Sequence, residues 1–306
     1  MYQVVRVRLN QATDVIEPNR GVPGTTATES AALGALAIGS QLGHANVLID
    51  IRTGAARARR RYRISYALTW VVIVGAVISL LYAAGKIDPQ FIALWAPYIL
   101  GGVPATLLIT VLSISFAMVI ALVGALGRLA PWAPVNAAAS LYVSLVRGTP
   151  LIVQLLFFYL ALPQLVPATA NIPVIALGIF ALAFNYGAYM TEIFRAGIQA
   201  VPRGQIEAAY ALGMSASQAF TRIVLPQAFK IVIPPIGNDF IGMIKDSALV
   251  SIITVQELLW RAQLVGQMNF RSLETLLVAA AVYWTLTLIF SAVQVRIERR
   301  LARSGT

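Results

Sequence analysis

Long stretches without a single charged residue dominate this sequence. Residues 64–84 form the first stretch, and residues 91–127 form a longer one. A helix needs about 20 mainly apolar residues to cross a bilayer, and helices are the usual spanning structure because lipid offers unpaired backbone groups no partner. Only 11% of the residues are charged and 58% are hydrophobic, whereas soluble domains have roughly 25% charged residues. The sequence therefore predicts an all-α polytopic membrane protein and excludes an ordinary soluble enzyme.

The charge-free stretches and the breaks between them predict a bundle of about six spans. The stretch 91–127 is too long for one helix, and Pro97 with Gly101–Gly102 indicates an approach segment before the second span. Pro163 closes the third span. The expected spans cover residues 64–84, about 100–126, about 140–161, about 172–193, 226–246 and about 275–295.

Lys and Arg side chains predict the orientation, because they are retained on the cytoplasmic side of spans. With the N-terminus inside, the outer connections hold only Lys86, Arg261, Arg271 and Lys245. The inner segments hold Arg57, Arg59, Arg60, Arg61, Arg63, Arg128, Arg147, Arg195, Arg203, Arg222, Lys230 and the C-terminal arginines. Both termini are therefore predicted to be cytoplasmic. The net charge of +11 is interpreted as membrane topology and not as nucleic-acid binding.

Residues suited to redox, metal or acid–base chemistry are scarce. The chain has no Cys and a single His, His44, so no zinc-ligand set of the usual kind is expected. The phosphate-binding motif G-x-x-x-x-G-K-[ST] is missing, because the Gly85–Lys86 pair lacks the earlier Gly. We expect no catalytic residue, no metal and no cofactor in this chain.

The connection between the fourth and fifth spans, about residues 203–226, predicts a compact element. Pro202 fits the first turn of a short helix that Gly213 can end. Ser215 and Gln218 form a capping box for a second short helix, and Pro226 fits the first turn of the next span. We therefore expect two short helices joined at a Gly on the cytoplasmic face, able to dock a partner.

This connection resembles the EAA loop of bacterial ABC importer permeases. The family pattern is Glu-Ala-Ala, a Gly four residues after the second Ala, and an Ile-x-Leu-Pro ending. Its positions are occupied here by Glu207, Ala208, Ala209, Gly213, Ile223, Leu225 and Pro226. The resemblance implies that these residues form the coupling helix that sits in a groove of the ATPase subunit.

Three flanking segments are similar to permeases of polar amino-acid uptake systems: Arg147–Pro163, Ala183–Gln205 and Gly237–Leu258. The resemblance covers roughly residues 95–300 and implies a fold like that of type I ABC importer permeases, with cytoplasmic coupling helices. The expected division of the chain is a flexible cytoplasmic extension rich in small and polar residues (1–62), an extra N-terminal transmembrane helix (63–90), the permease transmembrane domain (91–300) and a C-terminal tail (301–306). The extension and the extra span depart from the family core, which commonly has five spans.

The resemblance also implies partners. ATP and Mg²⁺ are expected on separate ABC ATPase subunits, because this chain lacks a nucleotide-binding motif. A second copy of the permease or a homologous permease, an extracytoplasmic substrate-binding protein and membrane lipid are the other expected partners, with no nucleic acid among them. The expected location is the bacterial cytoplasmic membrane.

Polar side chains inside the spans are candidates for the substrate pathway, because such groups are costly in lipid unless they face a cavity or a partner. Asp239 with Asn238, after the Pro234–Pro235 break, is the first candidate, and a hydrogen bond between helices is the alternative role. The further candidates, for which interhelical packing is the alternative, are Gln154, Asn185, Tyr186 and Tyr189.

Other charged residues near span ends have structural interpretations. Glu192 and Arg195, three residues apart, are expected to pair near the cytoplasmic gate. Lys245 and Asp246 are expected to end the fifth span at the outer surface.

Two functional hypotheses stay open at this point. The first is the permease subunit of an ATP-driven importer of amino acids, and the acidic Asp239 favours a cationic one. The second is a secondary transporter driven by an ion gradient, with Asp239 as the cation site. The EAA loop favours the first, because a self-contained transporter has no use for it.

Overall fold

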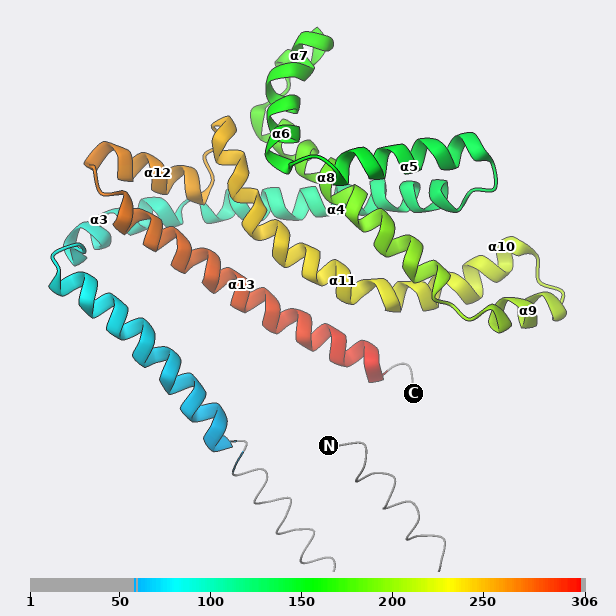
Figure 1. Cartoon of the computed structure of the whole chain (residues 1–306), viewed down its shortest axis with the longest axis horizontal. Coiled ribbons are helices and arrows are strands. Elements are labelled where there is room, and N and C mark those ends of the chain that lie inside the picture. Colours follow the sequence, from blue (N-terminus) through cyan, green and yellow to red (C-terminus); the bar gives the residue numbers. More distant parts are fainter. Residues whose placement is uncertain (1–57, 59, 304–306) are drawn as a thin grey trace, which may run out of the picture. The chain divides into compact units, whose positions relative to one another are not determined.

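The structure, a computed structural model, describes residue 58 and residues 60–303 (Figure 1). The predicted extension 1–62 therefore lies almost wholly outside the described residues, and so does part of the tail 301–306. The described residues form helices and turns without any strand. They fall into two compact units, one ending at Leu80 and the other beginning at Leu81, and each unit is considered by itself.

The helix Arg60–Ala83 corresponds to the first expected span. It has 24 residues, and none of the residues in its most apolar stretch is buried within the described chain. The rings of Tyr62, Tyr66 and Trp70 follow one another along one side, with centroids 6.2 and 6.5 Å apart. Tyr and Trp rings are typical of the level where a span meets the headgroups.

The second span begins after a short helix, as the sequence predicted. Helix α3 (Pro89–Leu100) is capped by Asp88, whose Oδ1 accepts from the N–H of Gln90 at 2.9 Å. Helix α4 (Val103–Leu129) follows after Gly101–Gly102. A Cβ at Gly102 would lie 2.6 Å from the backbone of Leu258, so this Gly allows the chain to approach the segment before α12 closely.

The single helix expected at residues 140–161 is wrong. Helix α5 (Ala133–Arg147) ends there, and a second helical segment runs from Leu151 to Leu165, bent by 106° from α5. The bend falls at Gly148–Pro150, because Pro150 lacks an N–H and disfavours a helical conformation at Thr149. The second segment consists of α6 (Leu151–Leu156), the π turn η1 (Phe157–Ala161) and α7 (Leu162–Leu165).

The remaining elements complete the bundle (Figure 1). The 3₁₀ turn η2 (Pro167–Asn171) leads into α8 (Val174–Gln199), which covers the fourth expected span. The others are α9 (Arg203–Ala211), α10 (Ala216–Ala219), the π turn η3 (Phe220–Val224), α11 (Leu225–Asp246), the 3₁₀ turn η4 (Ser247–Ile253), α12 (Leu258–Asn269) and α13 (Ser272–Arg303). Within the described residues five helical stretches are long and apolar enough to cross a membrane, or six if the bent α5–α7 pair is one span. This agrees with the expected bundle of about six spans.

Both π turns precede a proline by two residues. Pro163 follows η1, and Pro226 follows η3. A proline in a helix has no N–H for the carbonyl four residues earlier, and its ring collides with that carbonyl. A turn widened to the i+5 pattern moves the carbonyl aside, so the helix continues through the proline. For this reason α10, η3 and α11 form one continuous helical stretch, and the span does not begin at Pro226 as expected.

Helix α8 is the centre of the bundle and packs most extensively against α4. Its middle is lined by small residues that allow close approach, as in many helix pairs in membranes. A Cβ at Gly187 would lie 2.7 Å from a methyl of Ile120, and one at Gly124 would lie 2.4 Å from Thr191 Oγ1. The buried core around α8 includes Ile109, Ala117, Leu155, Leu182, Met190, Met243 and Ile253.

Polar ties join α3, α4, α12 and α13 at one end of the bundle. The fully buried Glu257 accepts from Tyr283 Oη at 2.5 Å and from Thr106 Oγ1 at 3.3 Å. Burial raises the pKa of the Glu257 carboxyl. At the surface of this end, Arg271 Nη1 lies 3.0 Å from Asp88 Oδ2, and the hydrogen bond from Arg271 holds the pKa of Asp88 below its usual value.

Candidate substrate cavity and coupling loop

A cavity of about 330 Å³ lies where the α5–α6 turn, α8 and α11 meet. It is more polar than the rest of the bundle interior. Its lining residues are Thr149, Pro150, Leu151, Asn185, Tyr186, Tyr189, Asp239 and Asp246. Four of the six residues predicted for the substrate pathway therefore line one cavity: Asn185, Tyr186, Tyr189 and Asp239.

Two carboxylates of α11 face this cavity. Asp239 and Asp246 are seven residues apart, which places them on the same side of a helix. Asp246 Oδ2 accepts from Tyr186 Oη at 2.7 Å. The buried Oδ2 of Asp239 has no hydrogen-bond partner among the described residues. One carboxylate of the cavity is thus tied to α8, and the other is available to a ligand.

Asp246 lies elsewhere than the sequence suggested. It does end α11, but its side chain lines the cavity instead of marking the outer surface, since the chain continues directly into η4. The spacing from Asp239 could have revealed it, because two acids seven residues apart in an apolar helix share a face.

Gln154 and Asn185 form a clasp beside the cavity. Asn185 Nδ2 donates to Gln154 Oε1 at 3.1 Å, and Gln154 Nε2 donates to the carbonyl of Val146 and to Thr149 Oγ1, both at 2.8 Å. Gln154 is buried and does not line the cavity. Its contacts fit the alternative role of hydrogen bonding between segments, because they hold the α5–α6 turn against α8.

Asn238 points away from the cavity. The Oδ1 of Asn238 accepts from Gln294 Nε2 of α13 at 2.9 Å. Gln294 Nε2 also donates to the Pro234 carbonyl at 3.3 Å. Neighbouring residues of a helix are turned by about 100° from one another, so Asn238 and Asp239 face different helices. The expected Pro234–Pro235 break is not an interruption, since α11 runs through it.

Arg147 and a group of ion pairs follow the cavity toward the α9 end of α8. The Arg147 guanidinium carbon lies 5.3 Å from the ring centre of Tyr189. One turn further along α8, Glu192 lies 2.9 Å from Arg128 of α4 and 2.7 Å from Arg195. The expected Glu192–Arg195 pair is confirmed, and Arg128 extends it to a second helix.

The loop between α8 and α11 has the predicted construction. Gly213 takes φ +77°, which few other residues adopt readily. The capping box is present, with Ser215 Oγ accepting from Gln218 N at 3.3 Å and Gln218 Oε1 accepting from Ser215 N at 2.9 Å. Pro202 is the residue before the first turn of α9 and not within it.

The seven residues of the Glu-Ala-Ala and Ile-x-Leu-Pro pattern divide by exposure. Ala209 is buried and Ile223 is half-buried. The exposed members are Glu207, Ala208, Gly213, Leu225 and Pro226. Leu212, beside Gly213, is 79% exposed. The loop therefore presents an apolar surface at its bend.

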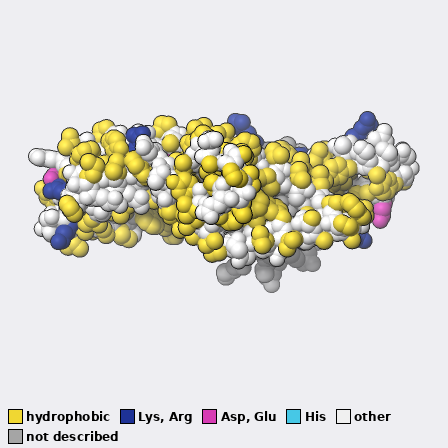
Figure 2. Space-filling view, turned by 90° about the horizontal axis from the view of Figure 1, so that it is seen from above, with side chains coloured by type: hydrophobic (Ala, Val, Ile, Leu, Met, Phe, Trp, Pro, Cys, Tyr) yellow, Lys and Arg dark blue, Asp and Glu magenta, His cyan; other side chains and the backbone are white. Residues whose placement is uncertain are grey.

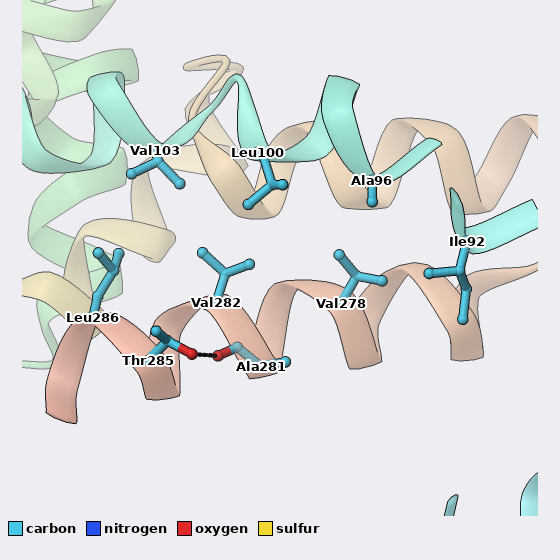
Figure 3. Close-up of a pocket in the computed structure, with 9 residues that line it drawn as sticks. All are labelled: Ile92, Ala96, Leu100, Val103, Val278, Ala281, Val282, Thr285 and Leu286. Carbon is cyan, nitrogen blue, oxygen red and sulfur yellow. Dashed lines mark hydrogen bonds between the residues drawn. The ribbon is translucent and has the colours of Figure 1, made fainter. Parts of the chain in front are cut away.

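A second cavity, of about 470 Å³, opens between α3 and α13 (Figure 3). Its labelled residues are apolar except Thr285, whose hydroxyl donates to the Ala281 carbonyl at 2.7 Å. A polar solute would find no charged partner there. Figure 2 likewise shows a face covered largely by hydrophobic side chains, with few charged ones between them. The cavity at Asp239 is therefore the better candidate for a polar ligand.

Comparisons with known proteins agree with this architecture. The family described as "Binding-protein-dependent transport system inner membrane component" matches residues 117–303. The L-cystine transport system permease protein TcyB of Bacillus subtilis (strain 168) is 41% identical over 208 residues, which are 68% of this chain and 88% of that protein. The arginine transport system permease protein ArtQ of the same organism is 38% identical over 205 residues, 67% of this chain and 93% of that protein.

Solved structures give the same picture. A chain from the crystal structure of an amino acid ABC transporter with histidines superposes with a TM-score of 0.65 at 39% identity, covering 70% of this chain and 99% of that one. The methionine ABC transporter MetNI, in an inward-facing form, gives a TM-score of 0.58 at 20% identity and so shows the fold alone.

The comparisons favour an ATP-driven importer over the ion-gradient-driven transporter that the sequence had left open. Permease subunits of such importers are not enzymes, because a separate ATPase hydrolyses the nucleotide. The chain belongs to the family of binding-protein-dependent transport system inner membrane components and is an integral-membrane permease subunit that works with an ATPase and a binding protein.

Proposed function

We propose that this permease carries amino acids, cationic ones above all, through the cavity between α8 and α11. The observation that carries the proposal is the pair Asp239 and Asp246 on one wall of that cavity, with a buried oxygen of Asp239 that has no partner among the described residues. Relatives named as amino-acid permeases support the substrate class.

Charge complementarity supports a cationic substrate. A carboxylate inside a membrane bundle is costly unless a cation or hydrogen-bond donors compensate it. Tyr186 gives Asp246 one donor, and an ammonium or guanidinium group could supply the others. Every amino acid carries one ammonium group at neutral pH, and a cationic amino acid carries a second positive charge, which matches two carboxylates.

Coupling is proposed to pass through the loop from Arg203 to Pro226. The exposed surface around Gly213 would seat in a groove of the ATPase, where ATP and Mg²⁺ are bound, so that nucleotide-driven closure of the ATPase pair shifts the permease between two states. Two permeases, either two copies of this chain or this chain and a homologue, would form the complex in a bacterial cytoplasmic membrane, with both termini on the cytoplasmic side.

Asp239→Asn tests the proposed cavity, because it keeps the side-chain volume and removes the charge. Uptake of lysine and arginine by proteoliposomes containing the permease, its ATPase and its binding protein should fall about 10-fold or more, while assembly with the ATPase stays normal. Asn238→Ala is the matched control, since Asn238 lies next to Asp239 but outside the cavity. Unchanged uptake of every amino acid by Asp239→Asn would contradict the proposal.

A further inference from the structure

The fixed charges that line the substrate cavity are all negative. Asp239 and Asp246 are the charged residues of its wall, and the other lining residues are neutral. On the proposed function, however, the substrate is an amino acid, whose α-carboxylate is as permanent as its ammonium group. A carboxylate placed among carboxylates is repelled. The cavity therefore needs a cation at its rim for the opposite end of the substrate.

Arg147 stands at that rim. It is the last residue of α5, two residues before Thr149, which lines the cavity. Its guanidinium carbon lies 5.3 Å from the ring centre of Tyr189, which also lines the cavity. A guanidinium stacked on a ring keeps the N–H groups at its edge free, and two of them match the two oxygens of a carboxylate.

Arg147 forms no ion pair among the described residues, and Glu192 interacts with its charge only at longer range. Arg128 and Arg195 both lie within ion-pair distance of Glu192. For Arg147, by contrast, the described part of the chain offers no acidic group within that distance, and its side chain is exposed.

The position of Arg147 beside Tyr189 argues against a role in membrane topology alone. It was counted from the sequence as a cation at the cytoplasmic end of a span. In the structure it contacts Tyr189, which lies ten residues before the end of α8 at Gln199, a rise of about 15 Å along the helix. A cation beside a polar cavity in a membrane-spanning bundle is by default a functional candidate.

We infer that Arg147 is the residue that binds the α-carboxylate of the substrate. Its guanidinium donates to the α-carboxylate, while Asp239 and Asp246 accept from the α-ammonium group and from the side-chain cation. Tyr189 is a positioning residue, because its ring supports the guanidinium. The arrangement selects zwitterionic amino acids over amines of the same length.

The test compares ligands with and without the carboxylate. Lysine and arginine are paired with cadaverine and agmatine, which lack only that group, and binding to the purified complex of permease and ATPase is measured by calorimetry without the binding protein. Arg147→Gln should weaken the binding of both amino acids about 10- to 100-fold and leave the amines within about 2-fold. Arg147→Lys should restore part of the loss. Asn238→Ala, which changes a side chain outside the cavity, should bind all four ligands like the wild type.

The outcomes separate this inference from the proposed function. Equal losses for amino acids and amines in Arg147→Gln, or no loss for either, would overturn the role of Arg147 and leave the cationic cavity standing. Wild-type binding of the amines as tight as that of the amino acids would overturn it as well. A wild-type complex that binds none of the four ligands would overturn both proposals.

Discussion

Gly213 combines a left-handed backbone with open space. Its φ is +77°, and a Cβ added there would meet no atom within 4 Å. A side chain at this position would therefore cost backbone strain of about 1 kcal/mol or more, without a collision inside the chain. Any larger effect must come from a partner that occupies the space.

Gly213→Asp should thus separate coupling from folding. The variant should insert into the membrane at normal levels, whereas co-purification of the ATPase should fall several-fold and uptake should fall with it. Gly204→Asp is the matched control, because Gly204 lies in the same loop, has no atom within 4 Å of an added Cβ and lacks the positive φ. Normal transport and normal ATPase association in Gly213→Asp would remove the loop from the coupling path.

Local rules predicted the residues of the loop well, and they predicted the cavity less completely. The turn at Gly213 and the Ser215–Gln218 box depend only on neighbours in the sequence, and both are present. Whether a polar residue in a span lines a cavity depends on the rotation of its helix and on the facing helix. Asn238 therefore meets Gln294 of α13, more than 50 residues away, which no local pattern could reveal.

At the scale of elements, one buried amide stabilises the bend between α5 and α6. Gln154 Nε2 donates to the Val146 carbonyl before the bend and to Thr149 within it. Hydropathy detects no interruption here, because Arg147 is the single charged residue of the expected helix at 140–161. The bend itself comes from Pro150, whose backbone effect a hydropathy pattern does not register.

Gln154→Leu should destabilise the permease by about 1–3 kcal/mol, since it keeps the approximate volume and leaves buried acceptors without a donor. Thermal unfolding of the purified protein in detergent would show this as a lower midpoint. Gln164→Leu removes a comparable but exposed bond to the Leu160 carbonyl and should change the midpoint little. Equal midpoints for the two variants would mean that Gln154 does not hold the bend.

For the whole molecule, the bent α5–α7 pair decides whether the number of membrane crossings is even or odd. If it crosses the membrane, the six stretches place both termini on one side. If it enters and returns on the same side, only five crossings are left and the termini lie on opposite sides. The arginine distribution favours six.

Reporter fusions can show directly on which side of the membrane each terminus lies. A reporter after Thr306 should report the cytoplasm, and one at residue 168, in η2, should report the exterior. A fusion at residue 58 that also reports the cytoplasm completes the test. A C-terminal reporter on the outside would show that the α5–α7 pair does not cross.

The π turn η3 has a further consequence for the relation between the coupling loop and the cavity. A turn of this kind holds one residue more than the α-helical path requires, and one residue corresponds to about 100° around the helix axis. The five residues from Phe220 to Val224 therefore set the rotational phase of Asp239 and Asp246 relative to Gly213, and Pro226 keeps the extra residue in place. Deleting Thr221 from this segment would leave Gly213 and the cavity residues unchanged, yet it would rotate the cavity wall of α11 by about 100° relative to Gly213.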